Sequence, residues 1–102
     1  MTYYFLNEDK TFTPCDLTQW GAQLKDHKVR RVVFEKVEGF DVSTVWIGMD
    51  MEPWIEGSIK LFETMVFSPD GDSEYQDRYT TYEQAIEGHK YAVEWVKEQA
   101  LL

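Results

Sequence analysis

The β-prone segments in the middle of this chain follow one another too closely for a parallel sheet. Residues 29–37, 40–50 and 59–67 are rich in β-branched and aromatic residues, and only a two-residue turn and an eight-residue loop separate them. A parallel pair of strands needs a crossover of about a dozen or more residues. The sequence therefore predicts an antiparallel sheet, to which residues 75–79 add a further short strand.

Turn and helix-capping residues on either side of these strands predict a hairpin and two helices. Residues 3–6 and 11–13 flank a turn-rich segment and are typical of a short hairpin. Capping boxes predict a helix over residues 16–26 and a longer one from residue 80 or 81 to about residue 100. We expect a single α+β domain spanning residues 1–102. In it, an antiparallel sheet of four to five strands packs against a short N-terminal-half helix and a longer C-terminal helix.

The charge of the chain narrows the classes of partner. Nineteen acidic residues against ten basic ones give a net charge of -9. Such a surface repels phosphate backbones and anionic lipids, so we expect no direct binding to nucleic acid or membrane. It favours a partner with a basic surface, or mimicry of nucleic acid, although the same charge can simply maintain solubility. Cys15 is the single cysteine, and no leader or long apolar run is apparent, so we expect a cytoplasmic protein.

Polar residues interrupt two apolar patterns. Glu63 is the single acid on the more apolar face of the predicted strand 59–67, and His89 lies on the core-facing stripe of the last helix. A buried carboxylate needs a partner, which Arg78 or His89 can supply. We therefore predict a buried polar cluster of Glu63, Arg78 and His89. Its role is either acid–base chemistry or the structural one of fixing strand register.

Enzymatic function is the weaker expectation. Asp50, Glu63 and His89 could converge as a small hydrolase or metal site, but their spacing does not require it. No nucleophile stands at a defined spacing, and the glycines are isolated rather than grouped into a phosphate-binding loop. The segment 70–74 lacks the full calcium-loop pattern. We expect a protein that is not an enzyme and that binds no cofactor or metal.

The outer side of the last helix is the predicted partner-binding surface. Tyr91 and Trp95 are four residues apart and lie opposite the predicted core stripe, with Glu87 and Glu94 nearby. Aromatic anchors in a polar rim are typical of protein interfaces. Two alternatives remain: the loop that contains Trp54 covers this patch, or the patch forms a two-fold interface in a homodimer.

Several segments resemble a family of small phage and prophage proteins of unassigned function. The matching residues are Val42–Asp50, Leu61–Phe67, Tyr75–Tyr79, Thr81 and Gly88–His89. The similarity is close over residues 42–90, whereas the N-terminal hairpin and helix match only in outline. Relatives often carry a histidine where this chain has Met51, so a histidine-dependent site at that corner is not expected here. The resemblance implies a phage-encoded accessory protein that acts in the host cytoplasm, and it implies no reaction.

These observations lead to one main expectation and two alternatives. The main expectation is a small acidic protein that binds and modulates or inhibits a host or defence protein. The first alternative is a nucleic-acid mimic that blocks a defence nuclease, and the second is the hydrolase or metal-binding protein built on Asp50, Glu63 and His89. Mimicry requires acids at phosphate-like spacing on one surface. The candidates are Glu8, Asp9, Asp70, Asp72, Glu74, Asp77, Glu83, Glu87 and Glu94.

Overall fold

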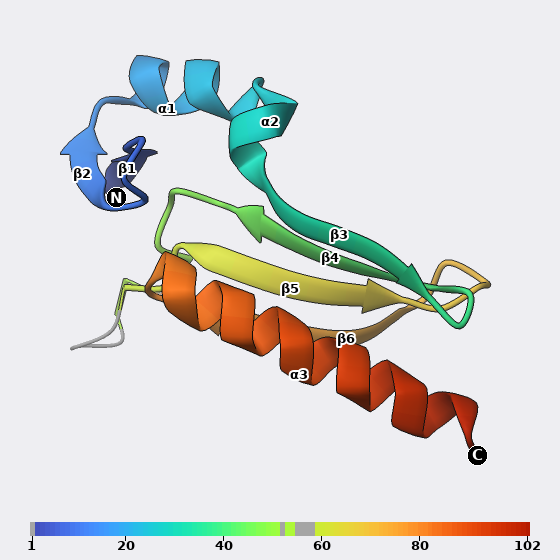
Figure 1. Ribbon diagram of the computed structural model, residues 1–102. Coiled ribbons are helices and arrows are strands. Elements are labelled where there is room, and N and C mark those ends of the chain that lie inside the picture. Colours follow the sequence, from blue (N-terminus) through green and yellow to red (C-terminus); the bar gives the residue numbers. More distant parts are fainter. Residues whose placement is uncertain (1, 52, 55–58) are drawn as a thin grey trace.

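The structure, a computed structural model, describes residues 2–51, 53–54 and 59–102. Its elements in chain order are β1 (Tyr3–Leu6), β2 (Phe12–Cys15), α1 (Leu17–Leu24), α2 (His27–Arg30), β3 (Arg31–Val37), β4 (Phe40–Trp46), β5 (Phe62–Phe67), β6 (Ser73–Tyr79) and α3 (Tyr82–Ala100). The predicted α+β class is confirmed. The four strands β3–β6 form one antiparallel sheet, and the hairpin β1–β2 forms a separate sheet of two strands (Figure 1).

The four-stranded sheet is a meander covered by α3 on one face. Its strand order is β3-β4-β5-β6, so that β3 and β6 are the edges. The helix runs along the sheet and contacts all four strands (Figure 1). Because side chains alternate between the faces of a strand, the α3 side of β5 carries Phe62, Thr64 and Val66. All three are buried.

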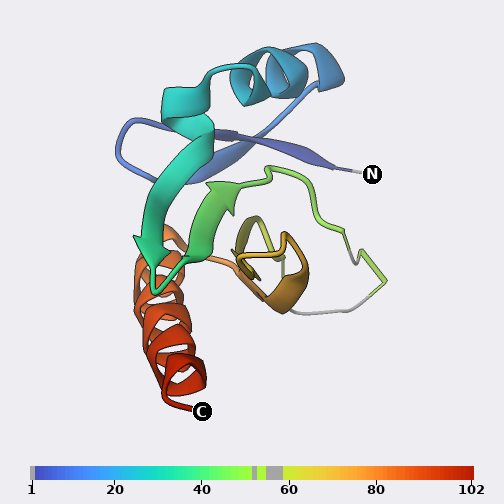
Figure 2. The ribbon, with the colours of Figure 1, turned by 90° about the vertical axis from the view of Figure 1, so that its right-hand side faces the viewer.

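The N-terminal elements lie at one end of this sheet, and the C-terminal end of α3 lies at the other (Figures 1 and 2). The Gln23 side chain in α1 donates to the Leu6 carbonyl and accepts from the Leu6 amide, at 2.8 Å each. The Tyr4 amide donates to the Gly48 carbonyl beyond β4 at 2.8 Å. These bonds join the hairpin to α1 and to the main sheet.

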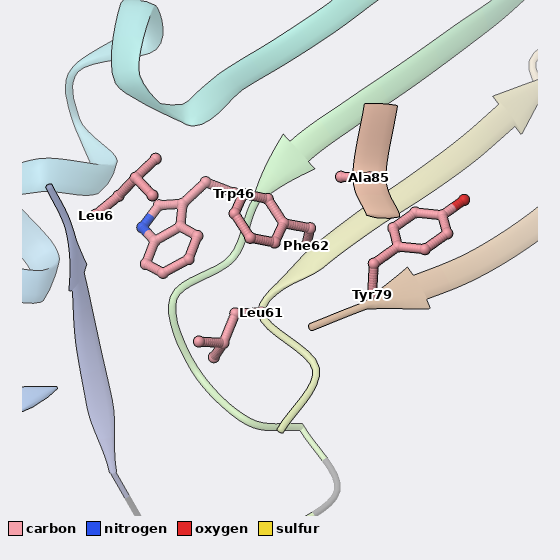
Figure 3. Close-up of a cluster of buried hydrophobic side chains, with 6 residues drawn as sticks. All are labelled: Leu6, Trp46, Leu61, Phe62, Tyr79 and Ala85. Carbon is pink, nitrogen blue, oxygen red and sulfur yellow. The ribbon is translucent and has the colours of Figure 1, made fainter. Parts of the chain in front are cut away.

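One cluster of buried side chains spans both parts of the molecule. Leu6 from β1 lies at one end of it, Tyr79 from β6 and Ala85 from α3 lie at the other, and Trp46, Leu61 and Phe62 fill the middle (Figure 3). The Trp46 and Phe62 rings are 5.0 Å apart, nearly edge to face. A second cluster of Val42, Val66, Ala92 and Val96 extends under the later turns of α3.

Several predicted boundaries differ from the structure. The helical turn α2, capped by Asp26, occupies the start of the segment predicted as strand 29–37, so β3 begins at Arg31. Strand β4 ends at Trp46 rather than at residue 50, and β5 begins at Phe62 rather than at residue 59. The predicted loop 51–58 falls largely outside the described residues. Within the part of the chain that the structure covers, no helix is long and apolar enough to cross a membrane.

The buried face of α3 consists mainly of small residues. The buried residues are Ala85, Gly88, His89, Ala92 and Val96. Gly88 faces the Tyr79 ring so closely that an added methyl group would overlap it. Small residues therefore define the face on which α3 approaches the sheet, because they let the helix lie close to the strands.

Candidate functional site

A chain of polar side chains runs through the interface between α3 and the sheet. The Nδ1 atom of His89 lies 2.7 Å from the Thr44 hydroxyl, which lies 2.5 Å from the Thr64 hydroxyl. The other ring nitrogen of His89 lies 2.9 Å from the Glu35 carboxylate. Both threonines and the histidine are buried, whereas Glu35 is about half exposed. We call Glu35, His89, Thr44 and Thr64 the polar relay.

The proton positions in the relay follow from its acceptors. An ionised Glu35 can only accept, so the Nε2–H of His89 donates to it. With a neutral ring, Nδ1 is then an acceptor, and the Thr44 hydroxyl donates to it. Thr64 in turn donates to Thr44. One consistent set of donors thus satisfies three buried polar side chains, which is the condition for keeping them in a core.

Tyr79 adds a buried hydroxyl next to this relay. Burial raises the pKa of Tyr79 to about 12, and the adjacent Thr64 hydroxyl acts in the opposite direction. The Tyr79 oxygen makes no direct hydrogen bond of good geometry to a described residue. Its acidity is therefore controlled mainly by the loss of water around it.

The prediction that Glu63, Arg78 and His89 form one cluster is wrong, as the register of the sheet shows. Glu63 is opposite Arg78 on β6, and its carboxylate accepts from the Arg78 Nε at 2.9 Å and from Gln76 at 2.6 Å. It lies on the sheet face away from α3, because Thr64 occupies the adjacent position that faces the helix. The structure thus pairs Glu63 with Arg78 and places His89 on the other side of the sheet.

The relay has the residue types of an activated nucleophile, but its geometry is closed. A Glu–His–Thr arrangement with these distances can withdraw a proton from the threonine hydroxyl. Thr44, however, has no solvent-exposed surface, and His89 is only 3% exposed. No substrate atom can reach the Thr44 oxygen without separating α3 from the sheet. The relay is best described as a structural network that orients α3.

The predicted metal or hydrolase set does not assemble. Asp50 lies beyond the end of β4, Glu63 lies on the open face of the sheet and His89 lies beneath α3. Over residues 2–51, 53–54 and 59–102, no three His, Cys, Asp or Glu side chains are grouped closely enough to hold a metal ion.

Of the two aromatic residues in the predicted partner surface on α3, Tyr91 is exposed and Trp95 is packed against the sheet. Tyr91 is 71% exposed. Trp95, one turn later, is half-buried and lies against Tyr75 of β6, with ring centroids 5.3 Å apart. Trp54 is itself 74% exposed, so Trp95 is supported by β6 and not by that loop residue. We call Tyr75, Tyr91 and Trp95 the aromatic ridge.

Acidic side chains border the aromatic ridge. Glu87 and Glu94 are exposed on α3, where they form ion pairs with Lys90 and Lys97 at 3.1 and 3.3 Å. On the β6 side, burial and then the nearby Asp77 carboxylate raise the pKa of Tyr75. The ridge is thus a partly apolar surface with lysine-paired acids on its α3 side and Asp77 on its β6 side.

The opposite edge of the sheet has the opposite charge. A shallow groove of about 590 Å³ lies along the start of β3 and is lined by His27, Lys28, Arg31, Val32, Val33 and Phe34. The Arg31 guanidinium lies over the Phe34 ring, 4.8 Å from its centroid. This basic groove was not predicted from the sequence, although four of the five residues from 27 to 31 are basic or histidine. Also not predicted were Glu35 and Thr44 as partners of His89 and Thr64 as the partner of Thr44, because each contact joins residues far apart in the chain.

Comparison with known proteins adds no assignment to this geometry. A scan against models of protein families found no match, and neither did searches of curated proteins and of solved structures. The functional conclusion therefore depends on the surfaces of this chain.

Proposed function

We propose that this protein is a binding protein that modulates or inhibits a host or defence protein, and that it binds through the aromatic ridge of α3 and β6. The observation that carries the proposal is Tyr91, a large aromatic side chain 71% exposed between acidic residues. Tyrosine and tryptophan are enriched among the residues that dominate binding energy. The association with a phage host follows from the resemblance to small phage proteins.

The packing around Tyr91 supports this role. Trp95 is held against Tyr75, so the surface next to Tyr91 is already ordered in the free protein. A preordered surface loses less conformational entropy on binding than a mobile one does. Glu87 and Glu94, each paired with a lysine of α3, lie at its border, and the nearby Asp77 and the net charge of -9 favour association with a basic partner.

A nucleic-acid mimic is less well supported by the same surface. Mimicry depends on an unneutralised array of acids. On α3, Glu87 and Glu94 are each paired with a lysine of the same helix, which lowers the field at the positions where phosphates would be imitated. The aromatic side chains between them have no counterpart in a phosphate backbone.

The test is quantitative binding of a captured host protein to matched variants. Immobilised wild-type protein is used to isolate partners from lysate, and each purified partner is then measured by surface plasmon resonance. Tyr91→Ala should weaken binding by about 2 kcal/mol, mainly through faster dissociation. Trp54→Ala removes an equally exposed aromatic residue elsewhere and should leave binding unchanged.

Reversing the charge of the acidic residues distinguishes their effect on the association rate from the effect of the aromatic side chains on dissociation. Glu87→Lys combined with Glu94→Lys should slow association and reduce its salt dependence. A partner that binds Tyr91→Ala as tightly as wild type would refute the proposed surface. Sedimentation analysis of the same variants tests the homodimer: self-association that Tyr91→Ala abolishes would assign the ridge to a second copy of this chain instead.

A further inference from the structure

Basic residues of this acidic chain gather beside one sheet edge. Residues 27–31 contain Lys28, Arg30 and Arg31, three of the ten lysines and arginines in a protein of net charge -9. These three side chains and His27 are all exposed. The cluster arises because the helical turn α2 runs directly into β3, so that a short basic segment lies at the start of the strand (Figure 1).

The groove beside these residues has both charged and apolar walls. Lys28 and Arg31 supply positive charge, while Val32, Val33 and Phe34 supply apolar surface along the strand. Phe34 is exposed, and the Arg31 guanidinium stacks over its ring. This combination suits a ligand that is extended, negatively charged and partly apolar, rather than a small free anion.

The strand that forms the groove is an edge strand. Among the described residues, β3 pairs with β4 and with no other strand. An edge strand presents a row of backbone amides and carbonyls that another chain can use to extend the sheet. The register shift at Arg31/Val33 is confined to the start of β3, and Phe34–Val37 pair regularly with β4.

We propose that the β3 edge and the basic groove bind an extended acidic segment of a partner protein by strand addition. Backbone hydrogen bonds to β3 provide affinity for any extended segment. Alternate acidic side chains of the segment reach Lys28 and Arg31 and provide the selectivity for acidic sequences. The other edge, β6, carries Glu74 and Asp77 and repels such a segment, which directs it to β3. This site differs in place and charge from the aromatic ridge.

A nucleic-acid strand fits the groove less well. Three lysines and arginines can neutralise few phosphates, and the remaining surface of a chain with net charge -9 repels a polyanion that extends beyond the groove. A short acidic peptide avoids this repulsion because its charge ends with the groove.

The first experiment tests strand addition with defined peptides. The probe is a labelled eight-residue peptide of alternating Glu and Val, titrated into the full chain while backbone amides are followed by NMR. We expect shifts concentrated in residues 31–37, with no such shifts for a peptide that has Lys in place of Glu. Two further peptides are N-methylated at odd or at even positions. Since an added strand uses the amides of alternate residues, one pattern should weaken binding at least about tenfold and the other should not.

The second experiment tests the basic residues with charge-matched variants. Lys28→Glu combined with Arg31→Glu should weaken the Glu/Val peptide at least about tenfold. Lys90→Glu combined with Lys97→Glu makes the same change in net charge on α3 and should alter it by less than about twofold. Tyr91→Ala should leave peptide binding unchanged, so failure here and failure of the aromatic ridge are distinguishable.

Three results would overturn the proposal. Equal tolerance of both N-methylation patterns would show that no strand is added. Stronger binding of a single-stranded oligonucleotide to residues 27–34 would assign the groove to nucleic acid. Absence of peptide binding at millimolar concentration would show that the charged edge does not bind acidic segments and serves only to prevent sheet-to-sheet association.

Discussion

Replacement of Gly88 by alanine is expected to destabilise the protein, although alanine is the better helix former. An added methyl group at Gly88 overlaps the ring edge and hydroxyl of Tyr79, which is only 7% exposed. Ordinary contact between carbon atoms requires the ring to move by on the order of 1 Å. Overpacking of this kind costs about 1–3 kcal/mol, and the gain in helix propensity returns about 1 kcal/mol. We therefore expect a net loss of up to about 2 kcal/mol.

The matched control is Gly21→Ala in the middle of α1. No atom outside its chain neighbours and the helix's own backbone lies within 4 Å of a methyl group placed there. Helix propensity alone should therefore stabilise this variant by about 0.5–1 kcal/mol. Thermal unfolding followed by circular dichroism measures both, because about 1 kcal/mol shifts the melting temperature by roughly 4–8 °C in a domain of this size. A Gly88→Ala protein that melts at or above the wild-type temperature would refute the close packing of α3 on Tyr79.

Three further predictions concern the relay, the tyrosine and the ridge. Thr44→Val should cost about 1–3 kcal/mol, because it leaves a buried imidazole nitrogen and a second hydroxyl without their partner, whereas Ser43→Ala on the opposite face should cost less than about 0.5 kcal/mol. Since the folded-state pKa of Tyr79 is raised to about 12, stability should fall as the pH rises from about 10 to 12, and Tyr79→Phe should reduce that fall. Trp95→Ala should cost about 2 kcal/mol through lost packing on β6, whereas the exposed Trp54→Ala should be nearly neutral.

Urea unfolding of the purified variants measures the first and third predictions, and wild-type and Tyr79→Phe melts across alkaline pH measure the second. Equal stability of Thr44→Val and Ser43→Ala would show that the hydroxyl chain contributes nothing. An alkaline loss of stability that Tyr79→Phe leaves intact would locate its source elsewhere, with Tyr75 as the next group whose pKa is raised. A Trp95→Ala variant as stable as Trp54→Ala would mean that the contact with Tyr75 carries no energy.

The amino-acid sequence by itself determined the local features of this fold. Short connections between strong β-segments predicted the antiparallel order, and the structure has it. The capping box at Asp16 forms as predicted, and at the last helix the box at Thr81 forms, one of the two that the sequence allowed; each joins residues three positions apart. The hairpin of the first fifteen residues is likewise present. Each of these depends on neighbours in the chain.

The tertiary structure decided which faces are buried. In residues 59–67 alternate side chains form two faces, and the more apolar face is not the one that packs against α3. Thr64 faces the helix, where its hydroxyl completes the relay, whereas Glu63 faces away and pairs with Arg78. On α3, Gly88 faces the sheet and Tyr91 faces solvent. The helix lies so close to the sheet that small residues fit between them and large apolar ones do not. The basic groove likewise exists only where α2 meets the edge of the sheet. Burial depends on the surface that an element meets, and that surface comes from distant parts of the chain.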